Sequence, residues 1–77
     1  MVNAYVLVDA DVGVATDLQA RFRDLDTVTD GHVVAGDWDV ILEVTGDEVY
    51  DVLSMVTDDI QAHDGVVDTK TYVSLEE

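Results

Sequence analysis

The 77-residue chain is predicted to fold as one α+β domain, a four-stranded antiparallel sheet with two helices on one face. Two observations lead to this prediction. Apolar residues alternate with polar ones in four segments, as in half-buried strands, and recur at helical spacing in two others. In chain order these segments are strand, helix, strand, strand, helix and strand. This is the order of the ferredoxin-like βαββαβ sandwich.

The first half of the chain supplies a strand, a helix and a second strand. Residues Asn3–Val8 show strand alternation, and the turn Asp9–Gly13 follows, with Asp11 as the expected N-cap of the helix. The apolar positions of that helix are Val14, Leu18, Phe22 and Leu25. Thr27–Ala35 is rich in valine and threonine and predicts a second strand, which Gly31 weakens.

The second half supplies two strands and the second helix. Gly36-Asp37 is expected to form a two-residue hairpin turn into a third strand, Trp38–Val44. Thr45–Glu48 fits a capping box, a hydroxyl cap with a carboxylate three residues later. The apolar face of the second predicted helix consists of Val49, Val52, Leu53, Val56 and Ile60. Gly65 is expected to stop this helix, and Val66–Leu75 to form the last strand.

One face of the predicted sheet has no helix to cover it. The first and third strands are expected at the centre of the sheet, and their second face, with that of the last strand, carries Tyr5, Leu7, Ile41 and Tyr72. An apolar second face on so small a domain usually marks a protein interface. A short chain also buries only about 60% of the surface that its unfolded form exposes. We therefore expect a dimer that forms through the open sheet face.

The charge is extreme, with 18 acidic residues against 3 basic ones and a net charge of -15. This sign excludes direct binding to nucleic acid phosphates and to anionic membrane surfaces. The acids are spread along the chain instead of forming a tail, which favours a surface adapted to concentrated salt, of the halophilic type. The alternative is a docking surface for a basic partner.

Residues that carry chemistry are scarce. The chain has no cysteine, and neither His32 nor His63 belongs to a nucleophile–histidine–acid pattern. The acid pairs in Asp9–Gly13 and at Asp24 and Asp26 do not match the calcium loop, and the glycines form no nucleotide-binding motif. We therefore expect no catalytic residue, no metal and no cofactor. The longest apolar run is far shorter than the roughly 20 residues that span a bilayer, and no signal peptide is visible.

Two stretches place small or hydrogen-bonding residues where loops meet strands. They are Gly36–Asp39, before the third strand, and Gly65–Thr71, which leads into the last strand. Together they resemble the signature of the effector-binding (RAM) domain of the Lrp/AsnC family. Its members carry a Gly-x-Tyr-Asp-type turn and, after the second helix, a Gly-Val-x-x-Thr-x-Thr run. The resemblance extends over essentially the whole chain, from Ala4–Val8 onward.

The resemblance implies a single effector-binding domain over residues 1–77 that senses small molecules without catalysis. Domains of the family form homodimers through their sheets, assemble into rings of dimers and bind effectors, typically amino acids, in clefts between dimers. The corresponding ligand-binding positions here are Gly36, Asp37, Trp38, Asp39, Thr69 and Thr71. A carboxylate would pair with the ammonium of the effector, while N–H groups and threonine hydroxyls would hold its carboxylate. Trp38 stands where a tyrosine is usual, and this removes a hydroxyl.

Classical members of the family carry an N-terminal helix-turn-helix, whereas this chain starts directly at its first strand. It therefore resembles the stand-alone form of the domain. The resemblance implies a cytoplasmic regulatory module that makes no direct contact with nucleic acid. Such a module would act through full-length Lrp/AsnC relatives or through another partner protein.

Three other functions remain open at this point. An ACT-like regulatory domain shares the order of elements, although Gly65–Thr71 speaks against it. A small enzyme of the dimeric α+β barrel type would need a titratable group on the inner sheet face, where the candidates are mostly apolar. A ligand-free assembly adaptor is the third. In that case Gly36 and Gly65 serve only turns, and Thr69 and Thr71 are ordinary strand residues.

Overall fold

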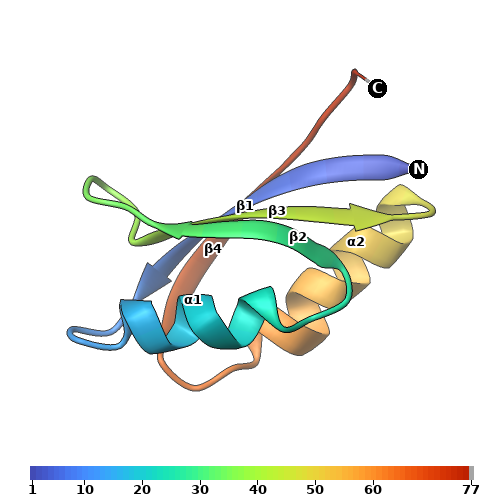
Figure 1. The fold of residues 1–77 in the computed structure, drawn as a ribbon. Coiled ribbons are helices and arrows are strands. Elements are labelled where there is room, and N and C mark those ends of the chain that lie inside the picture. Colours follow the sequence, from blue (N-terminus) through green and yellow to red (C-terminus); the bar gives the residue numbers. More distant parts are fainter. Residues whose placement is uncertain (77) are drawn as a thin grey trace.

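The computed structural model describes residues 1–76 and shows the predicted order of elements (Figure 1). The sheet consists of β1 (Val2–Ala10), β2 (Val28–Val33), β3 (Val40–Gly46) and β4 (Val66–Val73). The helical layer consists of α1 (Ala15–Arg23), α2 (Val49–Met55) and η1 (Val56–Gln61), a π-helical continuation of α2. The strands are antiparallel in the order β2-β3-β1-β4, which confirms the ferredoxin-like fold and the central place of β1 and β3.

The core lies between the sheet and the helices, which all lie on the same face of the sheet (Figure 1). Alternate residues of β1 and β3 are almost fully buried, and α1 and η1 cover them with large side chains such as Phe22 and Ile60. The buried set is Ala4, Val6, Val8, Leu18, Phe22, Val28, Val40, Leu42, Val44, Val52, Met55, Val56 and Ile60. Full burial of a side chain of valine size or larger stabilises the folded state by about 1.5–3 kcal/mol relative to leaving it exposed to water. The burial of these side chains therefore holds the sheet and the helices together.

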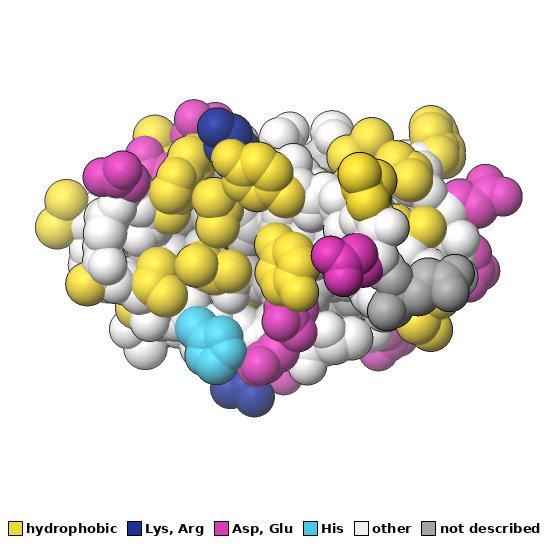
Figure 2. Space-filling model, turned by 90° about the horizontal axis from the view of Figure 1, so that it is seen from above, with side chains coloured by type: hydrophobic (Ala, Val, Ile, Leu, Met, Phe, Trp, Pro, Cys, Tyr) yellow, Lys and Arg dark blue, Asp and Glu magenta, His cyan; other side chains and the backbone are white. Residues whose placement is uncertain are grey.

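The other face of the sheet is open, as predicted, and strand register arranges it in rows. On β1, Tyr5 lies between Glu43 of β3 and Tyr72 of β4. In the next row on this face, Leu7 lies between Ile41 and Lys70. Tyr5 is 44% and Tyr72 51% exposed. Figure 2 looks onto this face and shows apolar side chains gathered across it, with acidic side chains beside them.

The connection between β2 and β3 differs from the prediction. The expected two-residue hairpin turn is a longer loop, residues 34–39, and β3 begins at Val40 instead of Trp38. The loop is tied back at Asp39, whose N–H donates to the carbonyl of Val8 at 2.9 Å and whose carbonyl accepts from Val34 N–H at 2.8 Å. Asp39 thus bonds to the end of β1, which holds the loop away from a tight hairpin.

Both predicted helix caps are wrong. The N-cap of α1 is Val14, without a side-chain hydrogen bond, instead of Asp11. Thr45 belongs to β3, where it pairs with Asn3 of β1. Because this pairing extends the strand, the second helix starts later than predicted. Its capping box joins Glu48, the N-cap, and Asp51, each bonding the backbone of the other.

The buried face of the second helix also differs from the predicted apolar face. Val52, Val56 and Ile60 are buried as predicted, whereas Val49 and Leu53 are 44% and 46% exposed. Met55 is buried on the helix, in addition to the predicted apolar face, next to the change from α- to π-helical geometry. The helical segment ends at Gln61, before Gly65, and Leu75 lies beyond the last strand.

The structure explains why glycine occupies position 31 in the middle of a strand, which the sequence does not reveal. Gly31 lies in β2 opposite Leu42, and a Cβ added to it would lie 2.9 Å from Cδ2 of Leu42. Leu42 is fully buried, so its side chain has little room to move. The glycine therefore permits close packing of the strand, and β2 forms in spite of it.

Candidate functional site

The two stretches that suggested a ligand site meet the same end of β1. Asp39, at the end of the β2–β3 loop, bonds to Val8 along one edge of β1. Thr69, near the start of β4, is paired with Val8 along the other edge. Figure 1 shows the β2–β3 loop at the end of the sheet where β1 terminates. The fold therefore places both predicted motifs on opposite sides of one short stretch of β1.

Asp39 has a structural role in this region, because it joins the β2–β3 loop to β1 by hydrogen bonds. Its Oδ2 accepts a hydrogen bond from the N–H of Ala10 at 2.8 Å, in addition to its two backbone bonds. These bonds fix the loop on β1 and use part of the acceptor capacity of the carboxylate. Asp39 is half-buried here. Its side chain is thus held in a defined position beside β1.

A row of acids runs across the sheet at this end. Partial burial raises the pKa of Asp9 above its usual range, and a hydrogen bond with the Asp39 side chain raises it further. The negative charges of Asp39, Asp68 and Asp11 act in the same direction. Asp68 is the residue paired with Asp9 on β4. The row therefore creates a negative potential that favours a cationic group nearby.

The two predicted threonines lie on the helix-facing side of β4, since their register partners Val8 and Val6 face the core. The hydroxyl of Thr69 accepts a hydrogen bond from the Gln61 side chain at 2.7 Å. A cavity of about 290 Å³ opens there, lined by Gln61, Val66, Val67, Asp68 and Thr69. Thr71 does not line this cavity.

The remaining predicted residues lie in the β2–β3 loop. Gly36 and Asp37 are exposed, and Trp38 is half-buried. None of these three, nor Asp39, lines the cavity that contains Thr69. The structure thus brings the two motifs to one end of the sheet without joining them in one pocket of a single chain.

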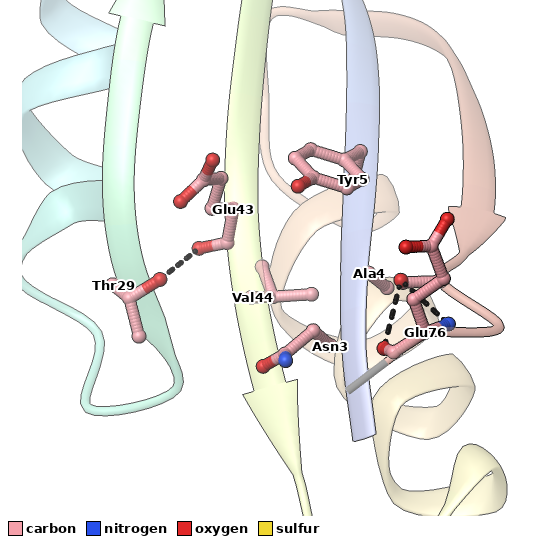
Figure 3. A pocket seen from close by; sticks show the side chains of 8 residues that line it. Asn3, Ala4, Tyr5, Thr29, Glu43, Val44 and Glu76 are labelled. Atoms are coloured by element: carbon pink, nitrogen blue, oxygen red, sulfur yellow. Dashed lines mark hydrogen bonds between the residues drawn. The ribbon is translucent and has the colours of Figure 1, made fainter. Parts of the chain in front are cut away.

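A larger hollow of about 530 Å³ lies on the open sheet face and was missed by sequence reasoning. Figure 3 shows Tyr5 and Glu43 side by side on neighbouring strands, with Asn3 farther along β1. The complete lining is Asn3, Ala4, Tyr5, Thr29, Glu43, Val44, Ser74 and Glu76. The polar groups that line this hollow are therefore hydroxyls, an amide and carboxylates. The only sequence signal was the placement of Tyr5 on this face.

Both histidines contact other residues of the fold: His32 lies beside an acid and His63 beside an aromatic ring. His32 is exposed on β2, with Nε2 3.1 Å from the Asp30 carboxylate. A hydrogen bond from Gly31 N–H lowers the pKa of Asp30, and the charge of His32 lowers it further. His63 packs edge-on against Phe22, with ring centroids 5.4 Å apart. Among residues 1–76, no group of three or more histidine and acidic side chains is arranged to hold a metal ion.

The order of strands and the single layer of helices define this protein as a small α+β sandwich domain of ferredoxin-like topology. Residues 3–77 match the family model described as the Lrp/AsnC ligand binding domain. Because the match covers nearly the whole chain, the protein belongs to this family.

Solved structures share the fold of this chain over its whole length. The chain is 25% identical to hypothetical protein PHS023 from Pyrococcus horikoshii, with a TM-score of 0.92, covering 100% of this chain and 93% of the other. It is also 25% identical to TTHA0845 from Thermus thermophilus, with a TM-score of 0.93 and coverages of 100% and 96%. The similarity therefore extends over nearly the full length of both neighbours.

A longer protein shares the fold. The transcriptional regulator NMB0573 from Neisseria meningitidis, solved as a complex with L-Met, is 22% identical with a TM-score of 0.86. The similarity covers 99% of this chain and 51% of that regulator. Curated protein sequences contain no match to the chain. Within residues 1–76, no helix has the length and apolar character needed to cross a membrane.

Proposed function

We propose that this domain is a non-enzymatic sensor of amino acids in a regulatory system, acting in the cytoplasm. One observation carries the proposal: the whole-chain match to a ligand-binding family, together with two family-like motifs at the same end of β1. The regulator that shares the fold was solved with L-Met, which supports an amino acid as the class of effector.

The proposed contacts follow from the surroundings of each residue. Asp39 holds the loop on β1 and shapes the site, while the exposed Asp37 is free to approach the ammonium of the effector. Thr69 lines a cavity and offers a hydroxyl. Gly36, Trp38 and Thr71 complete the proposed set. Since one chain does not join the loop and the β4 cavity, the complete site is formed between copies of the chain.

The open sheet face is the proposed dimer interface. Tyr5, Leu7, Ile41 and Tyr72 lie on it, and two tyrosines about half exposed in so small a domain are typical of an interface. A dimer formed there buries apolar surface that the 77-residue chain leaves open. Further assembly into rings, and association with full-length relatives, belong to the same proposal.

A thermal-shift screen tests the sensing function. The protein, in molar KCl, is heated with each of the twenty amino acids, and we expect at least one to raise the Tm by mass action. Asp37→Asn should reduce the shift, whereas the matched change Asp59→Asn, on the exposed side of η1, should leave it unchanged. If no amino acid shifts the Tm, the sensing proposal fails, and a ligand-free assembly adaptor explains the fold better.

A further inference from the structure

The second helix has an outer side, turned away from the sheet, that the core of the domain does not use (Figure 1). On its inner side, Val52, Val56 and Ile60 are buried in the core. An open hollow of about 400 Å³ lies on the outer side. It is lined by Tyr50, Leu53, Ser54, Thr57 and Asp58. We call this hollow the α2 groove.

The residues of the α2 groove have the spacing of one helix face. Leu53 and Thr57 follow Tyr50 by three and seven positions, and such residues are neighbours on a helix surface. Tyr50 is 76% and Leu53 46% exposed, so two large apolar side chains of one face are open to water. The change to π-helical geometry at Val56 falls within the same segment, and short π-helical turns are frequent at functional sites. Neighbouring exposed apolar groups at this spacing are typical of a helix that docks a partner.

Acidic side chains flank the α2 groove along the helix. Besides Asp58 in the lining, the exposed acids of this segment are Asp47, Glu48, Asp51 and Asp59. The sequence contains no lysine or arginine between Arg23 and Lys70. Within residues 1–76 the one ion pair joins His32 to Asp30, so these acids form no ion pair with a cation of their own chain. A surface with this charge attracts a cationic partner.

The charge and the geometry of the α2 groove select the class of occupant. A second copy of the chain would bring the same five acids to the contact, and like charges facing each other are unfavourable. Nucleic acid phosphates and anionic lipid headgroups have the wrong sign. Because the backbone groups of a helix bond to each other, the groove offers no edge to a strand. A helix can dock through side chains alone, by packing its ridges into grooves.

We propose that the α2 groove docks a basic amphipathic helix of a partner protein. The apolar side chains of that helix pack on Tyr50 and Leu53, and its lysines or arginines lie beside Asp58 and the flanking acids. The groove rises about 12 Å along the axis from Tyr50 to Asp58, so a partner segment of about three turns covers it. The groove and the open sheet face lie on opposite sides of the domain (Figure 1). Docking therefore depends neither on dimer formation there nor on amino acid sensing.

Three labelled synthetic peptides of about 18 residues test the chemistry of the partner. The first has leucines on one face of a helix and lysines on the other, the second has the same composition in scrambled order, and the third has glutamates in place of the lysines. Fluorescence anisotropy measures binding at the lowest KCl concentration at which circular dichroism shows a folded domain. We expect the first peptide to bind at least about tenfold more tightly than either of the others. Equal binding of the scrambled or the glutamate peptide would overturn the proposal.

Substitutions at exposed positions test the location without disturbing the core. Leu53→Ala and Tyr50→Ala keep a good helix former and remove the apolar contacts, so we expect each to weaken binding about tenfold. Val12→Ala, which removes an exposed apolar side chain before α1, is the matched control and should bind as the parent does. Asp58→Asn should weaken binding by roughly two- to fivefold. Asp17→Asn makes the same change of charge on the exposed side of α1 and should have no effect.

Amide NMR signals of the isotope-labelled protein locate the first peptide directly. We expect the perturbed signals to gather in residues 47–61, and this result together with selective weakening by Leu53→Ala supports docking in the α2 groove. Perturbations centred on β1 and β3, or equal weakening by Val12→Ala, would overturn the proposal. No amino acid effector is present in these experiments. Their failure therefore leaves the thermal-shift screen as a separate test of sensing.

Discussion

The Asp39 carboxylate accepts a hydrogen bond from the backbone N–H of Ala10 at 2.8 Å, linking the β2–β3 loop to the end of β1. The two residues are 29 positions apart in the chain. The bond satisfies a part-buried donor beyond the regular pairing of β1 with β3, which runs from Val2 to Val8. A motif residue that the family resemblance implies for a ligand site thus has a structural role, because it fixes the loop on β1.

Removal of this link is expected to destabilise the domain. Asp39→Ala leaves the Ala10 N–H without its acceptor, and we expect the free energy of unfolding to fall by about 1–2 kcal/mol. Asp39→Asn should cost less, because its amide oxygen still accepts. Denaturant unfolding in molar KCl measures both, with Asp37→Ala, on the exposed part of the loop, as the control. Equal stability of Asp39→Ala and Asp37→Ala would contradict the structural role.

The close approach of β2 to Leu42 predicts that Gly31 tolerates no side chain. In Gly31→Ala the new methyl would lie 2.9 Å from Leu42 Cδ2 before relaxation, and we expect a loss of about 1–3 kcal/mol from overpacking. His32→Ala, at the next and exposed position of β2, serves as the matched control. Thermal unfolding of the two variants compares them. A stable Gly31→Ala protein would show that the sheet moves to accommodate the methyl.

The acids around Asp9 predict a pH effect of defined sign. The pKa of Asp9 is higher in the folded protein than its ordinary value of 3.8. At pH values between the ordinary pKa and the folded-state pKa, the folded state therefore binds more protons than the unfolded state. The contribution of Asp9 to stability is therefore lost as the pH rises through its folded pKa. We expect Asp9→Asn to be more stable than the parent at neutral pH.

The advantage of Asp9→Asn should shrink as the pH falls toward the ordinary pKa, since Asp9 itself then becomes neutral. Unfolding curves collected at several pH values from neutral to acid measure this difference. The control is Asp30→Asn, because the folded state lowers the pKa of Asp30 and the opposite dependence follows. An Asp9→Asn advantage that stays constant with pH would argue against the charge cluster.

The open sheet face predicts the outcome of two substitutions. Leu7→Asp and Tyr5→Asp place charges in the apolar rows of the proposed dimer interface, and we expect a loss of open-face dimers. Light scattering after size exclusion measures the mass, and circular dichroism verifies the fold. Val12→Asp is the control, since Val12 is exposed and lies in the loop before α1. A parent protein that is strictly monomeric in molar KCl would overturn the dimer proposal.

The net charge of -15 predicts that salt stabilises the folded state. Concentrated KCl shortens the Debye length to about 3 Å at 1 M and removes most of the repulsion between surface acids. We expect the Tm to rise steeply from low to molar KCl, by about 4–8 °C for each kcal/mol gained. A flat Tm over this range would contradict salt adaptation and favour a basic docking partner as the reason for the acids.

Much of the fold was predictable because it depends on local patterns. The alternation in β1 and β3 and the helical spacing of Leu18 and Phe22 each require a buried face, and these faces fit together in the βαββαβ order. The open-face position of Tyr5 follows from the same alternation. The motifs Gly36–Asp39 and Gly65–Thr71 were also visible as patterns, which is why they indicated the family.

The tertiary structure alone decided where strands end and which groups meet. Thr45 has the sequence of a helix cap, yet its pairing with Asn3 makes it part of β3. Nothing local to Asp39 indicates that it bonds to Ala10, because that contact depends on two segments distant in the chain. Sequence by itself determined the pattern of buried faces and the charge of the surface. Long-range hydrogen bonding and strand register determined the geometry of the candidate site.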